Sequence, residues 1–243
     1  MTRFFITPEE MMSDIIILTG ENAAHAKVLR LKTGETVLVC DGQGCECLCV
    51  VTDYCSGSVT LSVTKRQEAS SEAATRASVY MGFPKADKLE HVIQKATELG
   101  AYEIVAFPSA RCISRPDEKT LSKKLERWQK IAASAAEQSG RGYIPKVVVL
   151  SSYSEALERA MHAEKAIFFY ENEAATTLHM ALEGPSFTTI SLMTGPEGGF
   201  EESEVLKAME AGLQICTLGK RILRCETAPL CALSAVMFAC GEF

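Results

Sequence analysis

The pattern of hydrophobic and polar positions changes near residue 70. Before that point the apolar stretches are short, as in TRFFIT, DIIILTG, ETVLVCDG, ECLCVVTD and SVTLSVTK, and Gly- and Asp-containing turns join several of them. These stretches predict β-strands. Residues 21–30 predict one helix, with Ala24, Val28 and Leu31 at helical spacing. The N-terminal part is therefore predicted to be a small antiparallel meander or barrel.

A polar segment follows. Residues 65–76 are rich in Ser and Ala, and we interpret them as a linker. Strands and helices then alternate, and the stretches ASVYMGF, EIVAFPS, KVVVLS, AIFFYE, TISLMTG and ICTLG are almost continuously apolar. Strands covered on both faces have this character. The pattern predicts two domains, residues 1–70 and 75–243, and the second is α/β with a mostly parallel sheet.

Two helices of the second domain have defined ends. One begins at Asp87 with Glu90 three residues later, which is a capping-box pattern, and Gly100 ends it. The other runs from about residue 117 to 139. Each has an apolar stripe, as expected for a helix that covers a sheet.

Composition narrows the class of protein. Hydrophobic residues make up 47% of the 243 positions, enough for a sizeable core, and no apolar run has membrane-spanning length. The N-terminus lacks a signal-peptide pattern. The ten cysteines therefore indicate a reducing compartment, and we expect a cytoplasmic protein without a membrane partner. Cys45, Cys47 and Cys49 do not have zinc-ligand spacing, so we expect no metal.

Charge is distributed unevenly. The chain has a net charge of −6, but residues 147–215 carry a net −8 and residues 81–146 a net +4. A basic segment beside an acidic one can form a local nucleic-acid surface on an acidic protein. An ordinary solvated helix face also explains much of this excess.

The stretch SLMTGPEGGFEESEV, residues 191–205, contains a glycine-rich loop between a predicted strand and a predicted helix. Open α/β sheets bind ligands at this edge. The glycine spacing does not match the common dinucleotide or triphosphate loops. Glu201, Glu202 and Glu204 follow, and each would repel a phosphate by about 3 kcal/mol at about 6 Å and a dielectric of 20. A cationic ligand such as S-adenosylmethionine fits better, and a tight turn before a capped helix is an equally supported alternative.

A second irregular loop, LGKRILRCETAP, residues 218–229, also follows a predicted strand and precedes a helix. Thr227 is expected to cap that helix, and Pro229 suits its first turn. Two such loops at one sheet edge can hold a ligand between them. We expect backbone groups to read an adenine that lies against Leu218, Ile222 and Leu223.

These motifs resemble a known family. LMTGPEGGF and LGKRILRCETA together resemble the cofactor signature of the RsmE family of SPOUT methyltransferases, which methylate N3 of a uridine in 16S ribosomal RNA of the bacterial small subunit. RFFI, HAKVLRLKTGE, PKADKLEHVIQKATELG, SARCIS and AAEQSGRGYIP resemble its other motifs, so the likeness covers essentially the whole chain.

The resemblance implies a PUA-like β-barrel domain followed by an α/β domain with a C-terminal trefoil knot. It also implies a homodimer, ribosomal RNA as partner and S-adenosylmethionine as cofactor. The residues expected at the cofactor are Thr194, Gly195, Pro196, Glu197, Gly198, Gly199, Leu218, Gly219, Ile222, Leu223, Arg224, Thr227 and Ala228. Tyr170 and Glu171 are weaker candidates.

Methylation at N3 sets chemical requirements. The nitrogen must lose its proton while charge spreads onto the flanking oxygens, and the base must be unpaired or flipped out. Arg111, Arg141 and Arg224 are candidates to stabilise that charge. Glu137 is a candidate base, although an ordinary surface role fits it equally well.

Phosphate contacts are expected from basic side chains, with His25 as a further surface candidate. The residues predicted to bind RNA are Arg3, His25, Lys27, Arg30, Lys85, Lys88 and Arg115. Two other functions remain open, namely methylation of another atom such as a ribose 2′-hydroxyl, and a non-catalytic RNA-binding ribosome assembly factor.

Overall fold

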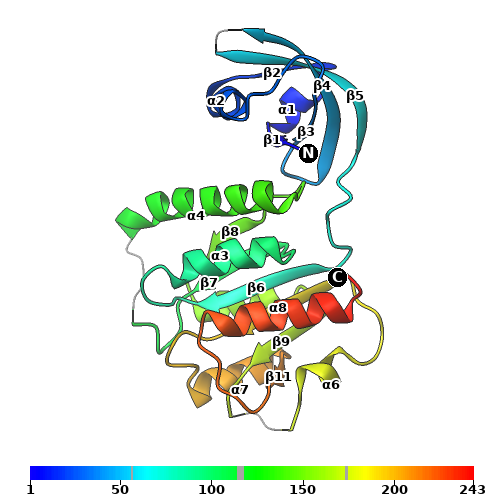
Figure 1. Cartoon of the computed structure of the whole chain (residues 1–243). Coiled ribbons are helices and arrows are strands. Elements are labelled where there is room, and N and C mark those ends of the chain that lie inside the picture. Colours follow the sequence, from blue (N-terminus) through cyan, green and yellow to red (C-terminus); the bar gives the residue numbers. More distant parts are fainter. Residues whose placement is uncertain (56, 114–117, 173–174) are drawn as a thin grey trace. The chain divides into compact units, whose positions relative to one another are not determined.

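The computed structural model describes residues 1–55, 57–113, 118–172 and 175–243 (Figure 1). The chain divides into two compact units. Unit 1 comprises Met1–Glu72 and Ala136–Ile144, and unit 2 comprises Ala73–Ala135 and Pro145–Phe243. The inclusion of Ala136–Ile144 in unit 1 had no signal in the sequence pattern. Among the described helices, none is long and apolar enough to cross a membrane.

Unit 1 is built on one five-stranded sheet in the order β1-β3-β4-β5-β2. Its elements are β1 (Arg3–Phe5), α1 (Pro8–Met11), β2 (Ile15–Leu18), α2 (Gly20–Val28), β3 (Thr36–Cys40), β4 (Cys45–Cys55) and β5 (Ser58–Glu68). Neighbouring strands are antiparallel except that β1 runs parallel to β3. The predicted antiparallel arrangement is therefore wrong for β1, which joins the edge of the sheet next to a strand far from it along the chain.

The predicted linker begins too early. Residues 65–68 continue β5, and their backbones pair with β4 from Leu48↔Lys65 to Cys45↔Glu68. The side chains of residues 65–68 are exposed. Polar residues are tolerated here because backbone pairing, and not burial, holds this end of the strand.

The helix α2 buries a different face from the predicted one. Ala23 and Ala26 are buried, whereas Ala24 is exposed and Val28 is 79% exposed. Two small side chains let the helix approach β5, which it contacts. Helical spacing alone did not distinguish these two faces, since both contain apolar residues.

Unit 2 contains a six-stranded sheet in the order β11-β9-β10-β6-β7-β8, and all its pairings are parallel. The strands are β6 (Arg76–Gly82), β7 (Glu103–Phe107), β8 (Lys146–Val149), β9 (Lys165–Phe169), β10 (Thr189–Thr194) and β11 (Gln214–Cys216). All six predicted strands are confirmed. Continuous apolar runs were a reliable signal because helices cover both faces of this sheet.

The helices of this region are α3 (Lys88–Glu98), α4 (Glu118–Ser139), α5 (Tyr153–Ala160), α6 (Leu178–Leu182), α7 (Glu202–Ala211) and α8 (Thr227–Ala239). The helix α8 packs on α3, β6 and β10, and α5 packs on α7 (Figure 1). The chain leaves β6 toward β7 and leaves β10 toward β11, on opposite sides of the β6–β10 pair. Such a switch point opens a crevice at the carboxyl ends of two neighbouring strands.

Two predicted helix caps are wrong. Asp87 precedes α3 but makes no side-chain capping bond, and Glu90 instead accepts a hydrogen bond from Arg127. Thr227 is the first helical residue of α8, after Glu226 at the N-cap position. Its N–H donates to the Arg224 carbonyl at 2.9 Å, so a backbone turn begins this helix.

Candidate functional site

The glycine-rich loop joins β10 to α7 at the switch point. Its last apolar residue, Phe200, is 1% exposed and belongs to the core of unit 2. The Phe200 ring lies 4.3 Å from the Phe168 ring, centroid to centroid, and stacks on Phe107 at 6.4 Å. Sequence reasoning missed Phe200, which anchors the loop in the core and so fixes the position of its backbone.

Two glycines allow this loop to lie close to its neighbours. A Cβ on Gly82, at the end of β6, would lie 2.6 Å from the Pro196 Cδ. Gly199 has φ +65°, and its Cβ would lie 2.5 Å from the Glu171 Oε1. The positive φ favours glycine at position 199, whereas the Glu171 carboxylate is the far end of an exposed side chain and can move aside. The loop is thus held against β6 on one side and a carboxylate on the other.

Arg111 follows β7 and lies against the same loop. Its Nη1 donates to the Gly198 carbonyl at 2.9 Å. A Cβ on Gly198 would lie 3.1 Å from the Arg111 Cβ. The structure therefore brings this predicted catalytic residue to the glycine loop, and its side chain remains exposed there.

The glutamates after the loop have distinct roles. Glu204 is 5% exposed and accepts the N–H of Ala110 at 2.8 Å and that of Glu201 at 3.0 Å. It therefore fixes the start of α7 to the loop after β7. Glu201 and Glu202 are exposed. Glu204, Glu201 and Glu202 are the three carboxylates that were expected to repel a phosphate. Of these, Glu204 accepts hydrogen bonds from two backbone N–H groups.

Lys88, at the start of α3, connects the two irregular loops. Its Nζ lies 3.2 Å from the Glu197 Oε1 in the glycine loop and 3.1 Å from the Glu226 Oε2 in the second loop. The Lys85 backbone N–H also donates to the Glu197 Oε1, at 3.0 Å. The Cys225 Sγ lies 3.6 Å from the Lys88 Nζ. We call Lys88, Glu197, Cys225 and Glu226 the loop clamp.

The electrostatics of the loop clamp keep it charged. The thiol of Cys225, the Glu226 backbone and Lys88 lower the pKa of Glu226 to about 2. Hydrogen bonds to Glu226 and Glu197 raise the pKa of Lys88. Burial raises the pKa of Cys225 to about 12, so the thiol stays protonated and donates to Glu226. Lys88 was predicted to bind RNA, but two carboxylates already pair with its ammonium.

The second loop presents both backbone and apolar groups. Thr217 Oγ1 accepts the N–H of Gly219 at 3.1 Å, and Gly219 has φ +103°. Ile222 is 86% exposed, whereas Leu218 and Leu223 are half-buried. Of the remaining predicted cofactor residues in this segment, Arg224 and Thr227 are exposed and Ala228 is half-buried.

Two predicted catalytic residues belong to unit 1. Arg141 is 5% exposed, and its Nη2 and Nε donate to the Glu72 Oε2 at 2.7 and 3.2 Å. The Glu137 Oε1 lies 3.0 Å from the His25 Nδ1. Through these contacts both side chains connect the segment Ala136–Ile144 to other residues of unit 1. Arg111 and the loop clamp lie in unit 2.

The other residues predicted to bind RNA fall into different environments. Arg3 has a side chain that is 10% exposed and pairs with Glu46 at 3.1 Å, so its role in RNA binding stays a prediction. Lys27, Arg30 and Lys85 are exposed. Arg115 lies outside the described residues. Within the described part of the chain, no group of three or more His, Cys, Asp and Glu side chains forms a metal site.

Comparison with known proteins gives the family. Residues 71–237 match the model of an RNA methyltransferase domain, and residues 18–63 match the model of an RNA methyltransferase PUA domain. The predicted fold class, a PUA-like domain before a SPOUT methyltransferase domain with a mostly parallel sheet, is confirmed.

Individual relatives agree with the family models. Ribosomal RNA small subunit methyltransferase E of Bacillus subtilis (strain 168) is 35% identical, over 98% of this chain and 96% of the relative. The crystal structure of the protein of that name from Neisseria gonorrhoeae, bound to S-adenosyl methionine, is 33% identical with a TM-score of 0.84. It covers 98% of both chains. The chain with the glycine loop and loop clamp described above therefore belongs to the ribosomal RNA small subunit methyltransferase E family.

Proposed function

We propose that this chain transfers a methyl group from S-adenosylmethionine to N3 of a uridine in the 16S ribosomal RNA of the small subunit. The observation that carries the proposal is the loop clamp, which ties the two loops of the family's cofactor signature together at the switch point. The Neisseria relative, described as bound to S-adenosyl methionine, supports the cofactor. Action on ribosomal RNA implies a cytoplasmic location in a bacterium.

The residues of the two loops suit a cationic nucleoside. Gly199 lets the backbone approach a ligand closely, and the neighbouring Glu171 carboxylate is exposed. Among the ion pairs of the described residues, none includes Glu171. A free carboxylate favours a sulfonium or ammonium and opposes a phosphate. The exposed Ile222 provides apolar surface for a base.

We assign the binding of the cofactor to residues of both loops. They are Thr194, Gly195, Pro196, Glu197, Gly198, Gly199, Leu218, Gly219, Ile222, Leu223, Arg224, Thr227 and Ala228. Glu197 acts through the loop clamp, because Lys88 and the Lys85 N–H already bind its carboxylate. Thr194 and Pro196 are buried, so they can offer only their backbones, whereas the others are exposed or half-buried. Glu171 joins this set on the strength of its position beside Gly199.

The protein must position the uracil and stabilise the charge that develops on it. S-adenosylmethionine supplies a methyl group that its sulfonium already activates. The site must then hold the uracil in line and stabilise the negative charge that reaches the uracil oxygens when N3 loses its proton. Arg111 is the best candidate, since its guanidinium is exposed and fixed to the glycine loop by one bond to Gly198. Arg224 is the second candidate, and Arg141 and Glu137 are disfavoured by their partners in unit 1.

We also propose that the chain acts as a homodimer through α8. No charged residue occurs between Thr227 and Ala239. One face of the helix packs on α3, β6 and β10, yet Cys231 and Ala235 on other faces are exposed and Phe238 is 74% exposed. A helix that is apolar all round is normally buried on all sides. A second copy of the chain would cover this surface.

Two alternatives make different predictions. A SPOUT enzyme acting on a ribose 2′-hydroxyl would bind the same cofactor but give a methylated ribose. An assembly factor that only binds RNA would not bind the cofactor. Titration calorimetry with S-adenosylmethionine separates these classes: we expect saturable binding, and an absence of binding by the folded protein would refute the enzymatic proposal.

A further inference from the structure

The helix α4 carries a row of basic side chains outside the proposed cofactor site. Lys119, Lys123, Arg127 and Lys130 are exposed and follow one another at spacings of four, four and three residues. These spacings place them on one face of the helix. At 1.5 Å per residue the row is about 16 Å long. We call these four residues the α4 basic row.

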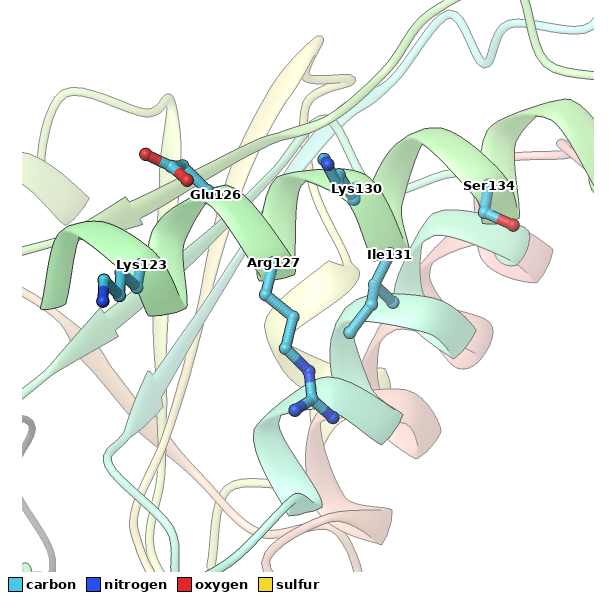
Figure 2. Close-up of a pocket in the computed structure, with 6 residues that line it drawn as sticks. All are labelled: Lys123, Glu126, Arg127, Lys130, Ile131 and Ser134. Atoms are coloured by element: carbon cyan, nitrogen blue, oxygen red, sulfur yellow. The ribbon is translucent and has the colours of Figure 1, made fainter. Parts of the chain in front are cut away.

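The α4 basic row borders a groove. The groove has a volume of about 390 Å³ and is lined by Lys123, Glu126, Arg127, Lys130, Ile131 and Ser134. Figure 2 shows Lys123, Arg127 and Ile131 extending from the same side of α4. The lining therefore combines three cations with one carboxylate, one apolar side chain and one hydroxyl. The cations outnumber the carboxylate, and cations and hydroxyls are groups that contact a phosphate backbone.

The charge of this surface contrasts with that of the whole chain. Residues 119–134 hold five basic side chains and one acidic side chain, a net of +4, although the chain has a net charge of −6. In the described residues, Arg127 pairs with Glu90 at 2.7 Å and keeps a side chain that is 69% exposed. Among the described residues, no ion pair includes Lys119, Lys123 or Lys130. Concentrated positive charge on an acidic protein favours a polyanionic partner.

We propose that the α4 basic row binds the phosphate backbone of the substrate RNA. This inference rests on the proposed function for the identity of the polyanion. It adds a surface on one helix of unit 2 to the exposed basic residues predicted in unit 1. Backbone contacts of this kind give affinity and orientation and carry no sequence information.

Salt dependence of RNA binding tests the inference. Lys119→Gln, Lys123→Gln and Lys130→Gln together remove three charges from exposed positions. The binding constant for 16S ribosomal RNA transcribed in vitro is measured between 50 and 200 mM salt. Each lost phosphate contact flattens the slope of log K against log salt by about 0.7 to 0.9, so we expect the triple variant to lose about 2 to 3 units of slope. A wild-type slope would overturn the proposal.

Two matched variants control for general charge effects. Lys207→Gln removes an exposed lysine from α7 and is expected to leave the slope unchanged. Glu126→Gln removes the acidic side chain that lines the groove and is expected to tighten binding. If Lys207→Gln weakens binding as much as Lys123→Gln alone, the effect is one of net charge, and the proposed surface is wrong.

The proposed function is tested separately in the same proteins. If wild type methylates small subunits but the triple variant keeps the wild-type salt slope, the α4 basic row is not an RNA surface and the function stands. If the triple variant loses slope but wild type transfers no methyl group, the surface stands and the enzymatic assignment fails. Calorimetry with S-adenosylmethionine should give equal affinities for both proteins, which confirms that the triple variant is folded.

Discussion

At the scale of residues, long-range pairing decides which polar side chains are available for function. Arg3, Arg141 and Lys88 were all expected to meet RNA or substrate, and all three pair with carboxylates that lie far away along the chain. The sequence around a basic residue does not show whether its side chain is buried in an ion pair or exposed to solvent. Only the fold reveals its partner, because the sequence separation of Arg3 and Glu46 is 43 residues.

Lys88 is expected to act as a positioning residue for the cofactor loops. Lys88→Met leaves the carboxylates of Glu197 and Glu226 without their shared cation. Affinity for S-adenosylmethionine should fall by about tenfold, as expected for the loss of charge-assisted hydrogen bonds, and Lys88→Arg should restore part of it. The matched control is Lys85→Met, since only the backbone of Lys85 contacts Glu197. Equal losses in Lys88→Met and Lys85→Met would count against the loop clamp.

The loop clamp also predicts a pH dependence. The folded-state pKa of Glu226, about 2, lies below its ordinary value of 4.5. Its contribution to stability is thus fully present above about pH 4.5 and is lost as the pH falls toward 2. The difference in melting temperature between wild type and Glu226→Gln should be constant from pH 5 to 8 and shrink below about 4.5. A difference that persists undiminished at pH 3 would contradict this assignment.

Arg111 should show two separable effects. Loss of its bond to the Gly198 carbonyl should weaken cofactor binding by no more than about tenfold, the worth of one exposed hydrogen bond. Loss of charge stabilisation at the uracil should lower single-turnover methyl transfer by on the order of 10²–10³-fold. Arg111→Ala and Arg111→Lys are compared with saturating cofactor and RNA. A rate within a few-fold of wild type in Arg111→Ala would leave Arg224 as the stabilising residue.

At the level of helices and strands, the sequence predicted the apolar strands but not the contacts that join the loops to one another. The strands of unit 2 are buried on both faces, so their sequences identify them without further information. The polar end of β5 and the buried face of α2 depend on partners supplied by β4 and β5. The two irregular loops were located correctly by their position after strands. Their mutual attachment through α3 had no sequence signal, because a lysine at the start of a helix is usually solvated.

The glycine loop should not tolerate a side chain at position 199. Gly199→Ala combines a left-handed backbone, which costs an alanine about 1–2 kcal/mol, with a contact to the Glu171 carboxylate. We expect cofactor affinity to fall by at least about tenfold while the fold is retained. Adding Glu171→Ala removes the contact but not the backbone strain, so recovery should be partial at most. Wild-type affinity in Gly199→Ala would show that the loop is only a structural turn.

At the scale of the whole molecule, the sequence pattern indicated two regions, and the family resemblance supplied the rest. The trefoil knot that the resemblance implies has no signal in the hydrophobic pattern, since chain connections almost never thread through loops. The assignment of Ala136–Ile144 to unit 1 could not be predicted either, because the sequence of α4 predicts one continuous helix. Hydrogen bonds from Arg141 and from the backbone of Gly142 to Glu72 connect that segment to the rest of unit 1.

The homodimer gives a prediction at this scale. Phe238→Glu places a charge on the exposed apolar face of α8, and we expect the dimer to dissociate to monomers in sedimentation experiments, because the charge would be desolvated at the interface. Phe243→Glu is the control, since this residue is also exposed, at 67%, but lies beyond the end of α8. A wild-type monomer, or a dimeric Phe238→Glu, would rule out this interface.

Nucleoside mass spectrometry can detect directly whether the chain methylates N3 of a uridine in 16S ribosomal RNA. Small ribosomal subunits without the modification are incubated with the protein and S-adenosylmethionine, and the RNA is then digested to nucleosides. We expect 3-methyluridine in amounts approaching one per subunit with wild type, and far less with Arg111→Ala in the same time. A ribose-methylated nucleoside, or no methylated product from a protein that binds the cofactor, would contradict the proposed function.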